Sequence, residues 1–200
     1  MTNTEEYSRA EQTRARLFSA ALTAFSDHGF HGTTTRDIAS AAGMSPAALY
    51  VHHKSKEELL YLISKGGHEQ VLDTVRTTIA SAEGSGARLA AVVRALVVHH
   101  ARAHTGSRVV NYELTSLSDE HLAEVLDVRR RIDAEIRHLV EQGVAEGAFD
   151  TPDPHMASVA LLSLSIDISR WYRDGGSWSP EGIADFYADL ALRMVGYRRG

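Results

Sequence analysis

Apolar residues recur every three or four positions along most of the chain, which is the period of a helix that buries one face. The first such segment runs from Thr13 to His28 and ends at the glycine-containing stretch HGFHG. Its apolar side consists of Leu17, Ala20, Ala21, Ala24 and Phe25. Strand-type alternation is almost absent, so the pattern predicts an all-α protein.

Two very short helices with separate start signals follow the first helix. Thr34 and Asp37 have the spacing of a capping box, with Asp in the position usually taken by Glu, and Gly43 suits the end of that helix. Ser45 offers a capping oxygen for a third helix, and Pro46 fits its first position, where a missing N–H costs nothing. Each short helix is therefore predicted to begin independently.

Two short helices that are joined by a glycine turn and braced by a longer helix form a helix-turn-helix motif. The second helix of such a motif presents its first residues to the major groove of DNA. Here that helix is predicted to end near Tyr50, and Pro46, Ala47 and Ala48 are small enough to let the backbone approach DNA closely. A plain helical bundle with short connecting helices is the alternative that spacing alone leaves open.

The remaining sequence predicts long helices. Ser55 and Glu58 have capping-box spacing for a helix that begins at Lys56. Further helices are predicted over residues 85–104, 119–147, 154–172 and 180–197. The last of these has a sustained apolar seam, and the one before it is apolar nearly all round, so both need partners on several sides.

Composition and charge limit the classes of protein. The 200 residues include no cysteine, which excludes disulfides and thiolate metal sites. The N-terminus lacks a signal pattern and the longest apolar stretches are interrupted by Ser and Asp, so we expect a cytoplasmic protein without membrane contact. Residues 1–65 hold seven Lys/Arg and seven Asp/Glu, so the remainder carries the whole net charge of −5. This gradient is compatible with a nucleic-acid face at the N-terminal end and also with chance variation.

No arrangement typical of catalysis or cofactor binding is present. His100 and His104 have the i, i+4 spacing of a metal-binding pair, with His99 beside them, but no Glu lies between them as in HExxH. The chain also lacks a G-x-S-x-G elbow and a glycine-rich phosphate loop. We therefore expect no catalytic residue, no bound metal and no cofactor.

The stretch FSDHGFHGTTTRDIASAAGMSPAALYVHHKSKEELL resembles the DNA-binding domain of the TetR family of bacterial transcriptional regulators. The resemblance covers about residues 11–60 and implies a three-helix helix-turn-helix domain. Carried over position by position, it implies DNA contacts at Thr34, Thr35, Arg36, Ser45, Pro46, Ala47, Ala48, Tyr50, His52 and Lys56. One position departs from the family pattern: His53 stands where Phe is usual, so we expect a neutral, partly buried histidine there.

The C-terminal half resembles TetR-type regulators of lipid and steroid catabolism, several of which sense acyl-CoA thioesters. The resemblance lies in YELTSLSDEHLAEVLDVRRRID, GVAEGAFDTPDP and RWYRDGGSWSPEGIADFYADLALRMV, where Asp174 replaces a common proline. TetR-like chains pair through their last two long helices, which implies a dimer interface at Leu161, Ile183, Tyr187, Leu190 and Met194. Polar and aromatic residues among the apolar middle helices are the predicted ligand contacts: His100, Tyr112, Glu113, Asp167, Arg170 and Trp171.

These features predict two domains, a helix-turn-helix domain over residues 1–55 and a helical effector-binding and dimerisation domain over residues 56–200. We expect a ligand-responsive repressor that binds a palindromic operator in double-stranded DNA as a homodimer. A small hydrophobic effector is expected to release it, with an acyl-CoA thioester as the candidate. The alternative is a helical small-molecule-binding or enzymatic bundle with a vestigial DNA-binding region.

Overall fold

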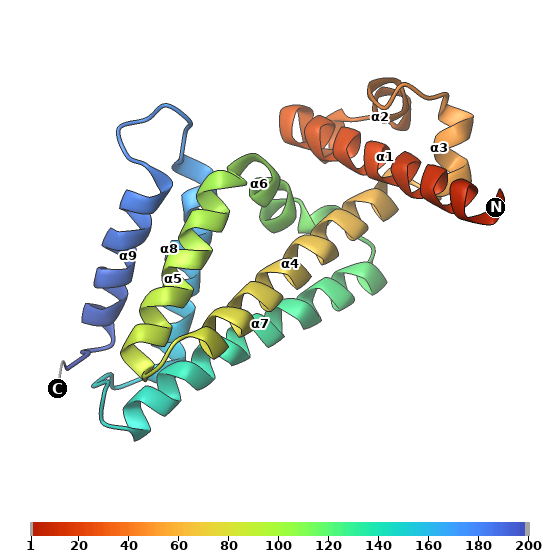
Figure 1. Cartoon of the computed structure of the whole chain (residues 1–200). Coiled ribbons are helices and arrows are strands. Elements are labelled where there is room, and N and C mark those ends of the chain that lie inside the picture. The colour runs from red at the N-terminus through yellow and green to blue at the C-terminus, as the bar shows by residue number, and fades with distance from the viewer. Residues whose placement is uncertain (1, 199–200) are drawn as a thin grey trace. The chain divides into compact units, whose positions relative to one another are not determined.

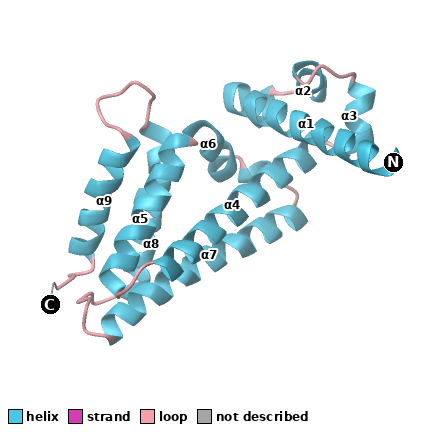
Figure 2. Ribbon diagram, viewed as in Figure 1, coloured by secondary structure: helices cyan, strands magenta, loops and turns pink. Residues whose placement is uncertain are grey.

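The computed structural model describes residues 2–198, with side chains from Ala10 onward, and this range contains helices and loops but no strand (Figures 1 and 2). The elements are α1 (Thr2–Gly32), α2 (Thr35–Ala41), α3 (Pro46–His52), α4 (Lys56–Ser81), α5 (Ser85–Arg102), α6 (His104–Tyr112), the 3-10 helix η1 (Leu114–Ser116), α7 (Asp119–Ala145), α8 (Pro154–Trp171) and α9 (Pro180–Met194). The prediction of an all-α fold is confirmed. No helix in the described range is long and apolar enough to cross a membrane.

Helix α1 begins earlier than the apolar pattern predicts and is interrupted at the predicted glycines. The polar residues before Thr13 are helical although they show no apolar period, which explains why the pattern missed them. Gly29 has a φ of 72° and a ψ of 167°, so the regular helix breaks there before a last turn to Gly32. Such a positive φ is readily adopted only by glycine, which is why HGFHG ends this helix.

The two short helices begin at their predicted caps. Thr34 caps α2 and Ser45 caps α3, and Gly43 between the two helices has a φ of 69°. The predicted box at the start of α4 is only half formed. Oγ of Ser55 accepts a hydrogen bond from the backbone N–H of Glu58 at 3.0 Å, but the Glu58 carboxylate accepts from the N–H of Lys54 at 2.5 Å instead of closing the box.

The chain divides into two compact units, each with its own apolar core. The first unit consists of the segment up to Gly66 together with Arg108–Val125, and the second consists of Gly67–Ser107 together with the residues from Leu126 onward. The centre of the first core contains Leu17, Phe25, Ile38, Leu49 and Leu59. The centre of the second contains Leu89, Leu96, Ile136, Leu139 and Ile168.

In the second unit, α5 lies along both α8 and α9 (Figure 1). The face that α8 buries includes Ser158, Ser165 and Ser169, and these hydroxyls donate to carbonyl oxygens of the same helix. Small, self-satisfied side chains allow α8 to be buried without unpaired donors. The predicted helix over 85–104 instead ends at Arg102, and the unpredicted α6 follows, because HTGSRVVNY is rich in residues of low helix propensity and gave no clear pattern.

Candidate functional site

The start of α3 forms the surface that the sequence assigns to the major groove. Oγ of Ser45 accepts a hydrogen bond from the N–H of Ala48 at 3.2 Å, and Pro46 occupies the first turn. Ser45, Pro46 and Ala47 are exposed, and Ala48 is partly buried. The turn therefore presents short side chains and backbone to the solvent.

The start of α2 is fixed by a complete capping box. The backbone N–H of Thr34 donates to the Asp37 carboxylate at 2.9 Å, and Oγ1 of Thr34 donates to the same oxygen at 2.6 Å. The N–H of Asp37 in turn donates to Oγ1 of Thr34 at 3.2 Å. These bonds, first that from the Thr34 hydroxyl, lower the pKa of Asp37. The predicted box is confirmed, and it leaves Arg36 exposed beside it.

A side-chain contact brings two predicted DNA-binding residues together from different helices. The hydroxyls of Thr35 on α2 and Tyr50 on α3 lie 3.2 Å apart, and Tyr50 is 54% exposed. Two hydroxyl groups that are adjacent, exposed and close to Arg36 in sequence are suitable donors for a phosphate. His52, at the end of α3, is partly buried.

Lys56 is used inside the protein. Its ammonium group donates to the carbonyl oxygens of Phe30 at 2.7 Å and Thr33 at 2.8 Å, and it lies 4.2 Å from the centre of the Phe30 ring. Two of its three N–H donors thus hold the end of α1 against the start of α4. The family resemblance implies a DNA contact at Lys56, and the structure adds this internal bracing role.

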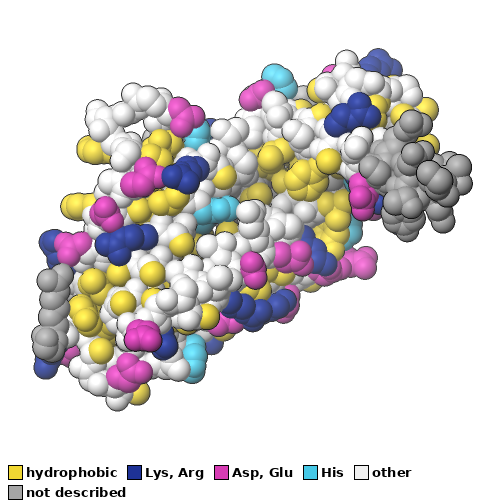
Figure 3. Space-filling view, in the orientation of Figure 1, with side chains coloured by type: hydrophobic (Ala, Val, Ile, Leu, Met, Phe, Trp, Pro, Cys, Tyr) yellow, Lys and Arg dark blue, Asp and Glu magenta, His cyan; other side chains and the backbone are white. Residues whose placement is uncertain are grey.

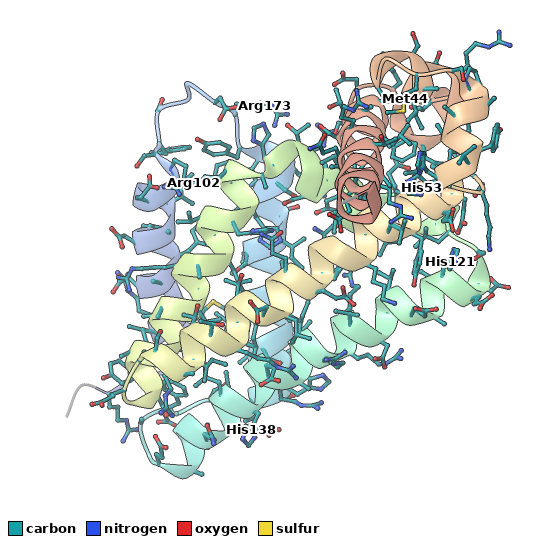
Figure 4. All side chains as sticks on the ribbon, turned by 45° about the vertical axis from the view of Figure 1, so that its right-hand side comes forward. Met44, His53, Arg102, His121, His138 and Arg173 are labelled. Carbon is teal, nitrogen blue, oxygen red and sulfur yellow. The ribbon has the colours of Figure 1, made fainter. Side chains whose placement is uncertain are left out.

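His53 is buried at the corner between α3 and α4 (Figure 4). Its ring is 6% exposed, and Nδ1 lies 3.9 Å from a carboxylate oxygen of Glu58. Among the residues whose side chains are described, none hydrogen-bonds to its Nε2. Burial lowers the pKa of His53, so the ring is neutral at physiological pH. A neutral histidine is what we expected at a position where the family usually has Phe.

The six predicted ligand contacts divide between the two units. Tyr112 and Glu113 belong to the first unit, and His100, Asp167, Arg170 and Trp171 belong to the second. In the second unit His100 is 3% exposed, whereas Arg170 is exposed and forms an ion pair with Asp167 one turn away at 3.3 Å. Trp171 is also partly exposed, and its ring meets that of Trp178 edge to face, with 6.4 Å between centroids.

The predicted dimer residues have different environments on α8 and α9. Leu161 and Ile183 are 3% and 6% exposed in the core of a single chain, so they have almost no surface left for a partner. Tyr187, Leu190 and Met194 are partly buried. The exposed apolar side chains on these helices and the loop between them are Met156, Val159, Leu164, Trp171, Trp178 and Phe186.

Two models of protein families match this chain, one near its N-terminus and the other over most of the remaining residues. The model of bacterial regulatory proteins of the tetR family matches residues 17–61, and that of the tetracyclin repressor-like C-terminal domain matches residues 82–195. The chain belongs to the TetR family.

Three similar proteins each align with nearly the whole chain. A crystal structure of a tetR-family bacterial regulatory protein from Rhodococcus RHA1 is 41% identical, covers 94% of this chain and 98% of its own, and has a TM-score of 0.89. The HTH-type transcriptional repressor KstR2 of Rhodococcus jostii is 29% identical over 181 residues, which is 90% of this chain and 89% of that protein. AibR, crystallised with isovaleryl coenzyme A and operator DNA, shares the fold at 24% identity with a TM-score of 0.82, covering 93% of this chain and 99% of its own.

This TetR-family chain is a helix-turn-helix transcriptional regulator rather than an enzyme. Its second unit contains His99, His100 and His104, the histidines whose spacing resembles that of a metal-binding pair. Across the described residues, no three His, Asp or Glu side chains are grouped closely enough to hold a metal ion.

Sequence reasoning missed a polar network within the first unit of this regulator. The His121 ring, labelled in Figure 4, stacks on Tyr61 with 3.9 Å between centroids, and its Nδ1 lies 2.8 Å from Oε1 of Glu57. The hydroxyl of Tyr61 donates to Glu124 at 2.7 Å, and Lys65 donates to the same oxygen at 2.7 Å. The bond from Lys65 is the largest cause of a lowered pKa at Glu124. The available signal was the interval of four between Glu57, Tyr61 and Lys65, which places them on one face of α4.

Proposed function

We propose that this TetR-family regulator is a repressor that binds a palindromic operator as a homodimer and is released by an acyl-CoA thioester. Residues 1–55 read the DNA, and residues 56–200 bind the effector and the second copy. The observation that carries the proposal is the exposed, capped turn at Ser45–Ala48 with Tyr50 and Thr35 beside it. The assignment as a repressor is supported by the naming of KstR2 as a transcriptional repressor.

The short side chains at the start of α3 suit sequence reading in the major groove. Ala47 can contact a thymine methyl group, and the Ser45 hydroxyl can contact a base edge or a phosphate. The hydroxyls of Tyr50 and Thr35, with the Arg36 guanidinium, supply sequence-independent contacts to the backbone. These two kinds of contact give opposite signatures, because base contacts change sequence preference and phosphate contacts change affinity for all DNA.

A second copy of the chain is the partner that best suits the apolar side chains of α8 and α9. Figure 3 shows hydrophobic side chains exposed on the α9 side of the second unit. Phe186 on α9 is 65% exposed and Met156 on α8 is 64% exposed, so burial of both would remove a large apolar area from water. A two-fold dimer also matches two half-sites of a palindrome, which is how helix-turn-helix dimers select their operators.

The effector part of the proposal is supported by chemistry in the second unit. The side chains of its core are almost all apolar, which is the chemistry that an acyl chain prefers, and exposed arginines at the end of α5 and in the loop after α8 could meet phosphates (Arg102 and Arg173 in Figure 4). Arg102 already holds an anionic group, the carboxylate of Glu181 at 2.5 Å. The fold of AibR accommodates isovaleryl coenzyme A. An effector that prefers the released conformation by about 3 kcal/mol would weaken operator binding about a hundredfold.

A gel-shift titration tests the proposal. The full-length protein is mixed with DNA from upstream of its own gene, and decanoyl-CoA, coenzyme A and decanoate are added separately. We expect a retarded complex that decanoyl-CoA releases and coenzyme A does not. Tyr50→Phe should weaken binding to specific and unrelated DNA alike, since it removes one phosphate donor. Tyr112→Phe, in the same unit but outside the predicted DNA contacts, is the matched control for DNA affinity without effector. Absence of retardation at low salt would refute DNA binding, and a complex insensitive to every acyl-CoA would refute the effector.

A further inference from the structure

The buried polar side chains that are described in the second unit can form hydrogen bonds and carry no formal charge at neutral pH. Among the described residues, the buried polar side chains of this unit are His68, Ser85, His100, Ser107, Ser158, Ser165 and Ser169. Among the described residues of this unit, no Lys, Arg, Asp or Glu side chain is buried. A carboxylate moved into such an interior would lose its hydration without gaining a cation, which is strongly unfavourable.

His100 has a fixed arrangement of protons within this interior. Its Nδ1 lies 2.8 Å from the carbonyl oxygen of Leu96 on the same helix. A carbonyl oxygen can only accept, so the proton of the ring sits on Nδ1. Burial lowers the pKa of His100 to about 4, so the ring carries no second proton at pH 7. Nε2 is consequently a hydrogen-bond acceptor and cannot donate to a carboxylate or a carbonyl.

We infer that the effector enters this core with an uncharged polar group that donates a hydrogen bond to Nε2 of His100, namely a hydroxyl or an amide N–H. The inference rests on the proposed effector-binding role of the second unit and narrows its ligand class. An acyl-CoA thioester fits, because its acyl end is uncharged and its pantetheine arm carries amide N–H groups, while its phosphates can remain in solvent. A free fatty acid does not fit, since it is an anion at neutral pH.

Three probes with the same alkyl chain test the donor requirement. Decan-1-ol is an uncharged donor, methyl decanoate is an uncharged acceptor, and decanoate is an anion. Calorimetry with the full chain at pH 7.5 should show that decan-1-ol binds about tenfold more tightly than methyl decanoate, the factor that one net hydrogen bond supplies. Decanoate should bind at least tenfold more weakly than decan-1-ol.

Variants of His100 show whether this residue sets the preference. His100→Phe keeps an aromatic ring and removes the acceptor, so the preference for decan-1-ol over methyl decanoate should disappear. His100→Gln restores an accepting oxygen and should recover part of it. His99→Phe alters the adjacent, partly buried ring and should leave the preference unchanged. Circular dichroism and DNA retardation establish that each variant is folded.

The outcomes distinguish failure of the donor requirement at His100 from failure of the proposed effector function. Decanoate binding as tightly as decan-1-ol, or a preference that persists in His100→Phe, overturns the inference and leaves the proposed effector response intact. If neither these probes nor decanoyl-CoA bind the protein, the inference and the proposed effector function both fall.

Discussion

Replacement of His53 by Phe should stabilise the DNA-binding unit and reduce its sensitivity to acid. His53 is buried against the first turn of α4, and no described side chain satisfies its Nε2. A buried polar atom without a partner costs about 1–3 kcal/mol, and Phe has a similar planar ring with no polar atom. We expect a net gain of about 1 kcal/mol at pH 7.5, after allowing for the slightly larger ring. A gain of that size would raise the melting temperature by about 2–4 °C.

The stability that His53→Phe adds to the first unit should increase as the pH falls. In the folded protein burial lowers the pKa of His53; His52 and Arg14 lower it further, and Glu58 opposes them. The unfolded chain binds its proton near pH 6.5. As the pH falls, the unfolded state therefore takes up the proton before the folded state does. The stability that depends on neutral His53 is fully present above about pH 6.5. It is lost as the pH falls toward the lowered pKa of His53 in the folded protein. His53→Phe should remove this loss.

Urea unfolding at pH 7.5 and pH 5.5, followed by circular dichroism, measures both effects. Trp171 and Trp178 both lie in the second unit, so their fluorescence reports on that unit and provides an internal reference. His28→Gln is the matched control, since it removes an exposed histidine from the same unit. An unchanged pH dependence of the first unit in His53→Phe, or a less stable first unit at both pH values, would show that the buried His53 ring does not carry this cost.

Three further changes have defined outcomes. Lys56→Met should lower the free energy of unfolding by about 1.5–3 kcal/mol, because two charge-assisted hydrogen bonds to carbonyl oxygens are lost, and thermal melting would show it. Phe186→Asp should convert the proposed dimer to monomers in sedimentation equilibrium, because a carboxylate would be forced into an apolar interface. Gly143→Ala should cost about 1–3 kcal/mol in chemical denaturation, because its Cβ would collide with the ring of Phe149.

Matched controls make these expectations sharp. Lys54→Met removes an exposed lysine near Lys56 and should leave the melting temperature within about 1 °C. Ala87→Asp adds the same carboxylate elsewhere on the second unit and should not change the dimer. Gly66→Ala places a Cβ in open space on α4 and should stabilise the helix by up to about 1 kcal/mol. If a variant and its control changed stability or assembly equally, the contact assigned to Lys56, Phe186 or Gly143 would not be the cause of the change.

Local features of the DNA-binding unit could be predicted from the sequence because their causes lie within a few residues. The capping box of Thr34 and Asp37, the left-handed Gly43 and the Ser45 cap all depend on contacts within one turn. The long helices after residue 56 were also predictable, since their apolar period is regular. The α6 helix was not, because its weak local propensity is overridden by tertiary packing.

The tertiary structure alone decided which side chains meet. The apolar period predicted that Leu161 and Ile183 lie against other apolar side chains. It could not tell whether those side chains belong to the core of the same chain or to a second chain across an interface. The same limit applies to Lys56. The family resemblance implied a DNA contact there, whereas in the fold its ammonium group binds two carbonyl oxygens of residues more than twenty positions away. Sequence spacing fixes the face of a helix on which a residue lies, whereas its partner depends on which element packs against that face, and that is determined only when the whole chain folds.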